Sequence, residues 1–334
     1  MRAAVFERAG QALAIETVDD PKPGAGEVVI KIHRCGICGT DLHLTSGHAF
    51  DFQPGTVLGH EYAGEIVEVG SGVEGFKAGD RITALPSKGC GHCAACTAGN
   101  PVLCHHSSGL FGGFGEYLKV PTANAVKLPS TLSLADGALV EPLAVGLHGV
   151  AIAAIQPGAR VLVQGAGAVA LATILWAKRL GAGRIVATSR AQRRAALALE
   201  MGADVFVQSG DDEAQEVVEA LGGPPQVVFE CVGVPGFLQK AIQQVDTFGK
   251  VLSMGFCIEP DAIMPALAAM KGVQFTFPIG YTMTEFQHAA DAFDAGRADP
   301  AKMISSVITL DQLPATFEML RGPNSETKVQ VSPV

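Results

Sequence analysis

The sequence lacks a long uninterrupted run of apolar residues. Its most apolar region, roughly residues 138 to 177, is broken by polar residues such as Glu141 and Arg160, so it falls short of the ~18 continuous apolar residues of a membrane-spanning helix. Near the start, Glu7 and Arg8 stand where a signal peptide would need apolar residues. We therefore expect a cytoplasmic protein that has no membrane partner.

An excess of positive charge is also missing. The chain has 24 Lys and Arg residues against 33 Asp and Glu residues, which gives a formal net charge of −9. Proteins built around nucleic acid depend instead on clustered cations that release counterions on binding. We therefore expect no nucleic-acid partner. No internal repeat, low-complexity tract or block of like charge is visible in the sequence.

Cysteines are too few for a disulfide scaffold, with eight in 334 residues. Four of them lie close together: Cys90, Cys93 and Cys96 form a CxxCxxC run, and Cys104 follows eight positions later. Thiolates at this spacing can surround one tetrahedral Zn²⁺ and leave no position open for substrate, which predicts a structural zinc site. The alternatives are a chance cluster of buried cysteines or a pair of disulfides. The spacing does not match the usual patterns of iron–sulfur proteins.

The chain is long and apolar enough to form two domains. Up to about residue 140, short alternating segments such as 27–32 and 63–69 are separated by Gly and Pro turns, which is typical of a small β-barrel. From about residue 158, strands alternate with helical stretches, which predicts a parallel, doubly wound sheet and an α/β fold. The predicted elements are strands at 160–164, 184–188, 227–231 and 327–331, and helices at 168–180, 191–201 and 284–295.

A glycine-rich turn follows the first strand of the second region. Gly165, Gly167 and Ala170 form a GxGxxA pattern between that strand and a helix. In a dinucleotide-binding unit the first glycine permits the tight turn and the second lets the backbone approach the pyrophosphate, while the third position packs the helix on the strand. We expect Ala168 and Val169, which open the helix, to contact the cofactor together with the two glycines.

The end of the next strand indicates which dinucleotide binds. An NAD-binding chain usually places Asp or Glu there to bind the ribose 2′-hydroxyl, but this sequence has Ser189 and Arg190, with Arg193 and Arg194 following. Guanidinium groups bind phosphate, and a carboxylate would repel it. The pattern therefore favours NADP(H) over NAD(H). The alternative, that these arginines only solvate a helix face, applies most to Arg193 and Arg194.

A second group of residues has the character of a catalytic metal site. The group is one thiolate with imidazoles and carboxylates, namely Cys38, His43, His60, Glu61 and Glu141. Each has a simpler explanation when taken alone, because a single His is more often a surface or core residue than a ligand. Cys35 and Cys38 could also form a redox CxxC pair, although nothing around them resembles a thioredoxin unit.

The order of these motifs resembles that of the zinc-containing medium-chain alcohol dehydrogenases. The shared features are GICGTDLH at 36–43, GHEYAGEIVEVGSGV at 59–73, the cysteine loop and the glycine-rich turn. The resemblance covers essentially the whole chain. It implies a GroES-like β-barrel catalytic domain over 1–143 and 282–334 with both zinc sites, a Rossmann domain over 144–281, and an active site between them. Relatives form homodimers or homotetramers, and we expect the same here.

The resemblance also assigns roles to residues. It implies two Zn²⁺ per chain: a structural zinc on Cys90, Cys93, Cys96 and Cys104, and a catalytic zinc on Cys38, His60 and one or both of Glu61 and Glu141. Asp41 would receive the ring N–H of His60 and fix its tautomer. Thr40 would contact the substrate oxygen and His43 would be the base at the far end of a proton relay. Lys328 would lie near the cofactor pyrophosphate. Thr40 and Asp41 could instead be simple turn formers.

Glu141 precedes Pro142, and this Glu-Pro pair resembles that of polyol- and glucose-dehydrogenase-like members of the family. The well-known alcohol dehydrogenases carry a second cysteine ligand at this position. A thiolate and two carboxylates would bring a zinc site to a net charge of −1 and weaken its Lewis acidity. We therefore predict that Glu61 and Glu141 do not both bind the metal while substrate is present.

The resemblance implies an oxidoreductase that moves a hydride between NADP(H) and an alcohol or carbonyl compound. Ser189-Arg190 favours a secondary alcohol dehydrogenase or ketone reductase, and the Glu-Pro pair favours a polyol or sugar dehydrogenase. Four apolar residues are candidates for the substrate pocket, namely Pro86, Leu110, Phe111 and Phe114, and they favour an apolar substrate. The third alternative is a catalytically silent protein that binds NADPH on the same fold.

Overall fold

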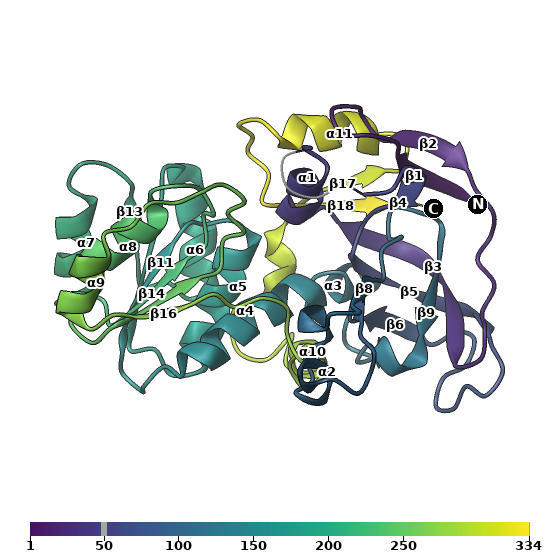
Figure 1. The fold of residues 1–334 in the computed structure, drawn as a ribbon, viewed down its shortest axis with the longest axis horizontal. Coiled ribbons are helices and arrows are strands. Elements are labelled where there is room, and N and C mark those ends of the chain that lie inside the picture. The colour runs from purple at the N-terminus through teal and green to yellow at the C-terminus, as the bar shows by residue number, and fades with distance from the viewer. Residues whose placement is uncertain (48–51, 334) are drawn as a thin grey trace. The chain divides into compact units, whose positions relative to one another are not determined.

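The structure is a computed structural model that describes residues 1–47 and 52–333. The chain divides into two compact units (Figure 1). The first unit contains Met1–Glu141, Tyr281–Asp294 and Ile304–Val334, and the second contains Pro142–Gly280 and Ala295–Met303. The first unit is therefore assembled from three separate stretches of sequence, and most of the second is one continuous stretch.

The first unit is mainly β structure. A seven-stranded sheet has the order β10-β6-β5-β3-β18-β17, with β9 paired to β3, beside a three-stranded sheet β2-β1-β4 and the pair β7-β8. The strands are β1 (Arg2–Phe6), β2 (Ala14–Thr17), β3 (Glu27–Gly36), β4 (Thr56–Val57), β5 (Glu61–Val69), β6 (Arg81–Ala84), β7 (Ser87–Lys88), β8 (Ser108–Gly109), β9 (Tyr117–Pro121), β10 (Ala125–Lys127), β17 (Ile304–Thr309) and β18 (Lys328–Ser332). The helices are α1 (Gly39–Leu44), α2 (Ala94–Thr97), α3 (Leu134–Gly137), α10 (Met283–Asp291) and α11 (Leu313–Leu320), with short 3-10 turns η1 (Pro101–Leu103) and η2 (Thr122–Asn124).

Strand β3 is the centre of this unit. It pairs antiparallel with β5, β9 and β18, and the pairing with β18 sets Gln330 opposite Gly36. Its apolar residues Val28, Ile30 and Ile32 are fully buried, because the alternation along the strand turns one side of the sheet toward the core. The C-terminal end of β3 therefore lies between the start of β5 and the start of β18.

The second unit is a parallel sheet covered by helices. The strand order is β13-β12-β11-β14-β15-β16, and every pairing is parallel, which confirms the predicted doubly wound sheet. The strands are β11 (Arg160–Gln164), β12 (Arg184–Ser189), β13 (Val205–Gln208), β14 (Val227–Glu230), β15 (Lys250–Ser253) and β16 (Gln274–Thr276). The helices are α4 (Val140–Ala153), α5 (Ala168–Arg179), α6 (Ala195–Met201), α7 (Glu213–Leu221), α8 (Phe237–Gln244) and α9 (Pro265–Lys271), with η3 (Gln192–Arg194) and η4 (Pro300–Met303).

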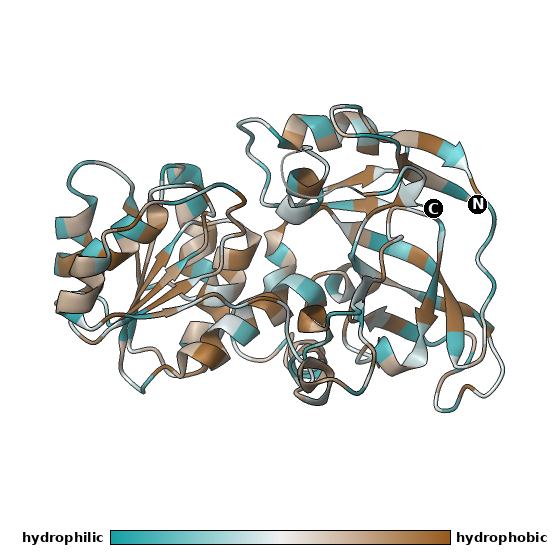
Figure 2. Ribbon diagram, viewed as in Figure 1, coloured by the Kyte–Doolittle hydropathy of each residue, from teal (hydrophilic) through white to brown (hydrophobic). Residues whose placement is uncertain are grey.

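The central strands of this sheet are buried on both faces, and they are largely brown in the hydropathy colouring of Figure 2. Val161, Leu162 and Val163 of β11 are fully buried, as expected of a parallel strand with helices on either side. Helix α5 packs against this strand with a run of buried residues from Ala170 to Ala177. These contacts hold the turn between β11 and α5 in a fixed position.

The units differ from the predicted domain ranges at residues 295–303, which we had assigned to the catalytic domain. In the structure these residues belong to the second unit. Arg179 at the end of α5 donates to the carbonyl of Ala295, and Lys302 pairs with Glu200 on α6. The predicted helix at 284–295 is also shorter and ends at Asp291.

Across residues 1–47 and 52–333, no helix is both long and apolar enough to cross a lipid bilayer. The cytoplasmic location stays a prediction.

Candidate metal centres and nucleotide site

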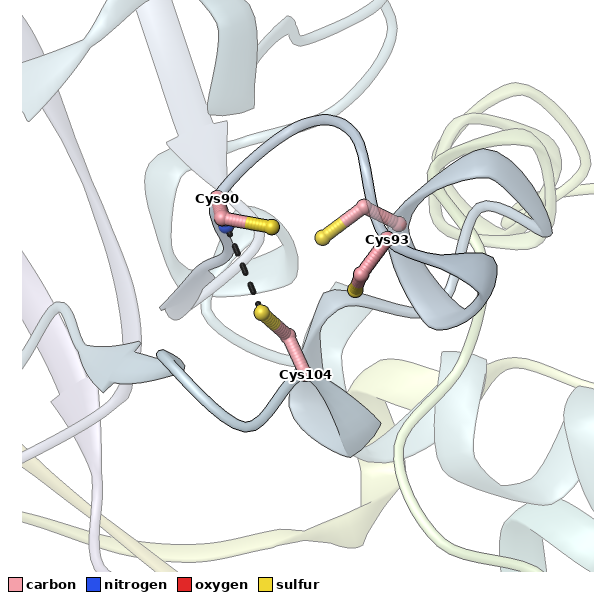
Figure 3. Close-up of side chains that lie close together, drawn as sticks. Cys90, Cys93 and Cys104 are labelled. Carbon is pink, nitrogen blue, oxygen red and sulfur yellow. Dashed lines mark hydrogen bonds between the residues drawn. The ribbon is translucent and has the colours of Figure 1, made fainter.

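Four thiols meet in the loop between β7 and β8. The sulfur atoms of Cys90, Cys93, Cys96 and Cys104 all lie within 4.8 Å of one another, and Figure 3 shows the three labelled side chains turned toward a common centre. None of the four is in a disulfide. The arrangement fits a tetrahedral zinc ion, since four thiolates are a complete ligand set for it.

The surrounding backbone favours the thiolate form of this cluster. The N–H groups of Cys90 and His106 donate to Cys104 Sγ over 3.4 and 3.3 Å. These hydrogen bonds lower the pKa of Cys104 to about 6. Gly89 makes room for the cluster, because a side chain at this position would run into Cys96 Sγ. The backbone of the loop therefore stabilises a thiolate at Cys104, while a backbone hydrogen bond at Cys96 is outweighed by burial and the neighbouring thiols, which raise the pKa of Cys96 to about 11.

A second possible metal site lies where β3, α1 and β5 meet. One ligand atom each from Cys38, His60 and Glu61 lies within 4.8 Å of the others. Cys38 is the N-cap of α1, so its position is fixed by the helix. His60 and Glu61 come at the start of β5, and both are buried. A thiolate, an imidazole and a carboxylate leave the fourth position of a zinc ion open, which is the pattern of a catalytic site.

The carboxylate of Asp41 contacts two of the three residues of this site. Its Oδ1 lies 3.1 Å from His60 Nδ1, and its Oδ2 accepts the backbone N–H of Cys38 at 3.1 Å. Burial disfavours a charged imidazole, but the charges of Asp41 and Cys38 outweigh burial and raise the pKa of His60. The structure therefore places Asp41 where the resemblance expects it, with His60 Nδ1 occupied and Nε2 left for a metal.

Cys35 takes no part in this site. Its side chain is fully buried, and a side chain at Gly59 or Gly113 would collide with its sulfur. Burial raises the pKa of the Cys35 thiol well above its usual value. A buried neutral thiol is poorly reactive, which disfavours the redox CxxC alternative.

Lys328 pairs with the metal-site carboxylate. Its Nζ lies 2.6 Å from both oxygens of Glu61 and donates to the carbonyl of Ile37 at 3.1 Å. The two side chains are 4% and 1% exposed, and although burial opposes it, the charge of Glu61 raises the pKa of Lys328. The expected contact with a pyrophosphate needs a free ammonium group, so the structure gives Lys328 a different partner from the one predicted.

Glu141 lies in the first turn of α4 and is not a member of the Cys38, His60 and Glu61 group among the described residues. Its Oε1 accepts a hydrogen bond from the Tyr281 hydroxyl at 2.7 Å. Burial, with the charge of Glu61 adding to it, raises the pKa of Glu141 to about 7. The two glutamates therefore have separate partners, and whether they bind a metal together stays a prediction.

One aromatic side chain, Phe111, lies beside the site. The ring of Phe111 lies 6.0 Å from the His60 ring and 5.5 Å from that of Phe52, both in edge-to-face geometry. Phe114, which we expected in the pocket, is fully buried and packs against Phe317 in the barrel core. Thr40 and His43 lie on α1 and are both partly exposed.

The glycine-rich turn adopts the conformation that its sequence predicts. Gly165 has φ of +107°, and a side chain there would also press on the carbonyl of Cys231. Gly167 is the N-cap of α5, followed by Ala168 and Val169 in its first turn, and Ala170 is fully buried. The N-terminus of a helix after such a turn is suited to a pyrophosphate.

A pocket of about 260 Å³ adjoins this turn. Its lining holds two arginines and no carboxylate: Gly165, Ala166, Gly167, Thr188, Ser189, Arg190, Arg194, Ser209, Cys231, Val232 and Phe237. Arg194 donates to the carbonyl of Ala166 at 3.1 Å, so it does not merely solvate a helix face. Arg193 is exposed and does not line the pocket. The pocket therefore brings the glycine-rich turn, Ser189 and two arginines together in one place.

Two regions of the chain match known protein families. Residues 24–130 match the alcohol dehydrogenase GroES-like domain, and residues 168–295 match the zinc-binding dehydrogenase domain. The whole chain is 36% identical over 344 residues to sorbitol dehydrogenase of Bacillus subtilis (strain 168), with 100% of this chain and 97% of that protein covered. The chain belongs to the zinc-containing medium-chain dehydrogenases.

Other dehydrogenases are similar to this chain over the same length. The (R,R)-butanediol dehydrogenase of Bacillus subtilis (strain 168) is 34% identical, with 96% of both chains covered. A zinc-binding dehydrogenase of Sinorhizobium meliloti 1021, solved with NADP, superposes with a TM-score of 0.90 at 34% identity over 99% of both chains. An alcohol dehydrogenase of Escherichia coli CFT073, solved with NADH and named as a short chain enzyme, superposes with a TM-score of 0.89 at 27% identity over 99% of both chains. This protein is accordingly a zinc-dependent alcohol or polyol oxidoreductase with a nicotinamide cofactor.

Two features of the site escaped the sequence analysis. Tyr281, which donates to Glu141, belongs to no sequence motif. The pairing of Lys328 with Glu61 joins residues that are 267 positions apart. The isolated basic residue in the strand 327–331 was the one available signal, because an ammonium group at an inward position of a strand needs a carboxylate partner.

We predict two zinc ions per chain. Cys93→Ser should lower the zinc content to one by removing a ligand of the thiolate cluster, and Cys38→Ser should remove the other zinc. The content is measured by mass spectrometry after gel filtration. Cys257→Ser is the matched control, because Cys257 belongs to neither group and should keep two ions. Two ions in both ligand variants would contradict the assignment.

Lys328→Met should leave the buried Glu61 carboxylate without a counter-ion. We expect a loss of about 3–5 kcal/mol in the stability of the metal-free protein, the usual result of breaking a buried pair. The double variant Lys328→Met, Glu61→Gln should recover part of this loss in a denaturation series. Lys302→Met, which breaks the exposed pair with Glu200, should have little effect. A double variant no more stable than Lys328→Met would show that the charge of Glu61 is not the cause.

Proposed function

We propose that this dehydrogenase uses NADP(H) to interconvert a secondary alcohol and its ketone, or a related carbonyl compound. The observation that carries the cofactor assignment is the nucleotide pocket, in which Ser189, Arg190 and Arg194 replace the expected carboxylate. Two guanidinium groups there would bind a 2′-phosphate through paired, charge-assisted hydrogen bonds. The NADP found with the Sinorhizobium meliloti relative supports the same assignment.

The residues of the metal site divide the work of catalysis. Cys38, His60 and Glu61 would hold the zinc ion, which supplies the Lewis acidity that polarises the substrate oxygen, while the nicotinamide accepts or donates the hydride. Asp41 keeps His60 Nδ1 protonated and so leaves its Nε2 as the ligand atom. Thr40 can accept the proton of an alcohol and donate its own, which passes the proton outward to His43.

The substrate class follows from the aromatic side of the site. Phe111 beside His60, with Phe52 packed behind it, offers apolar surface and no hydrogen bonds, which favours a ketone or simple secondary alcohol over a polyol. The polyol alternative is supported by Glu141 before Pro142 and by the sorbitol dehydrogenase relative. The silent NADPH-binding alternative conflicts with a complete set of Cys38, Thr40, His43 and His60.

Steady-state rates of the zinc-loaded protein test this function, using ketones and aldehydes with NADPH or NADH, and polyols with the oxidised cofactors. We expect the highest kcat/KM for NADPH with an apolar ketone. The double variant Arg190→Ala, Arg194→Ala should raise the KM for NADPH by about 10- to 100-fold, as two charge-assisted contacts are lost, and leave that for NADH nearly unchanged. Arg193→Ala is the control. Turnover restricted to NAD and polyols would favour the polyol alternative, and no turnover with any pair the silent one.

We also propose that the protein is a homo-oligomer, as a dimer or a tetramer. Strand β16 is an edge of the parallel sheet, and large apolar side chains around it are exposed: Phe248 at 79%, Met270 at 84% and Phe277 at 64%. An exposed edge with apolar neighbours is suited to pairing with a second copy.

Sedimentation of wild type and of the double variant Met270→Asp, Phe277→Asp tests this interface. We expect the variant to sediment as a monomer because two charges would be buried in the contact. Val307→Asp places a charge at another exposed apolar residue, 50% exposed on β17, and should keep the oligomer. A wild-type monomer would refute the proposal.

A further inference from the structure

The helix that carries Thr40 and His43 is held at its C-terminal end by an arginine from far along the chain. Arg321 follows α11, and its Nη1 donates to the carbonyl of Leu42 at 2.5 Å while its Nη2 donates to Thr45 Oγ1 at 2.7 Å. Thr45 Oγ1 in turn donates to the carbonyl of Asp41 at 2.7 Å. These contacts bracket His43 on both sides in the sequence, so the guanidinium fixes the turn of α1 on which the histidine lies.

The position of Arg321 is itself fixed by the core. Its guanidinium stacks 5.2 Å from the centroid of the Phe317 ring, and Phe317 is fully buried against Phe114. Its Nε pairs with both oxygens of Glu318 at 3.0 and 3.1 Å. The Arg321 side chain is 26% exposed and that of Glu318 is 42% exposed. The positive charge is therefore partly shielded from water and held in one place.

His43 on α1 is partly buried, and the guanidinium held at the end of this helix is that of Arg321. Burial first, and the charge of Arg321 second, lower the pKa of His43. The carboxylate of Asp41 on the same helix is engaged by His60 and Cys38, and the carboxylate of Glu318 is engaged by Arg321. The charge of Arg321, which Glu318 offsets in part, therefore acts on the imidazole from the end of the helix that Arg321 holds.

We propose that Arg321 is a positioning residue of the proton relay, which holds the last turn of α1 and keeps the His43 imidazole uncharged. The proposal rests on the proposed function, in which His43 receives the proton that an alcohol gives up through Thr40. An uncharged imidazole has a free ring nitrogen that can take this proton, whereas a protonated ring has none. Arg321 therefore extends the lower pH limit of alcohol oxidation without touching substrate.

The charge of Arg321 should shift the acid limb of alcohol oxidation to lower pH. A lower pKa keeps His43 uncharged to a lower pH, so alcohol oxidation persists under more acidic conditions. In Arg321→Gln the positive charge is gone, the pKa of His43 rises, and the acid limb of kcat/KM moves to higher pH. At pH values below that limb we expect kcat/KM to fall by about fivefold, the effect of roughly 1 kcal/mol of charge interaction in a water-like medium.

The decisive measurement is the titration of His43 in the full-length zinc-loaded protein by NMR of ¹³C-labelled histidine, with the signal identified by its loss in His43→Gln. Three variants give three expectations. Arg321→Gln raises the titration midpoint. Arg321→Lys keeps a charge and stays close to wild type. Glu318→Gln removes the carboxylate that offsets Arg321 and lowers the midpoint.

Each outcome has a clear meaning. A raised midpoint in Arg321→Gln, together with a matching shift of the acid limb and rescue by Arg321→Lys, supports the proposal. A lower thermal midpoint with an unchanged His43 titration means that Arg321 only caps α1, and this result overturns it. If the titration shifts as expected but no substrate is turned over, the coupling of Arg321 to His43 stands and the proposed function fails. The two failures are thereby distinguishable.

Discussion

The carboxylate of Asp41 is the interaction on which the catalytic site depends. One oxygen fixes His60 and the other fixes the backbone at Cys38, so a single buried group orients two candidate metal ligands from different elements. A buried carboxylate with only one partner would be costly, and the two contacts together satisfy it. Because α1 begins at this point, the same interaction also sets where Thr40 and His43 lie, and Arg321 secures the other end of the helix.

Three carboxyl groups and a thiol lie close together at the metal site, and their negative charges are partly compensated. Cys38, Asp41, Glu61 and Glu141 all lie at or beside the site, and Lys328 is the cation that compensates one of them. The concern that two glutamates would make the zinc site too negative applies less strongly once Glu61 has its ammonium partner. Glu141 is held by a neutral hydroxyl instead, and burial raises its pKa to about 7. The two carboxylates are therefore not equivalent.

Much of the site could be predicted because its parts are encoded locally. The cysteine loop and the turn at Gly165 each lie within a short stretch of sequence, where spacing alone limits the geometry. The partners of Lys328 and Glu141, the buried place of Phe114 and the packing of residues 295–303 depend on contacts between distant segments. The hydrophobic periodicity and the amino-acid composition of the sequence carry no information about such pairs, since many inward-facing positions on a strand look alike in sequence.

The long span of the Lys328–Glu61 pair bears on how the molecule assembles. Closing this contact joins residues 267 positions apart, with nearly the whole second unit between them. Distant contacts form slowly, because the chain loses much freedom before it gains any attraction. The βα units of the intervening unit consist of nearer neighbours and can order early. We expect the completed metal site to be among the last features to form, so the docking of β18, more than the supply of zinc, governs the rate of maturation.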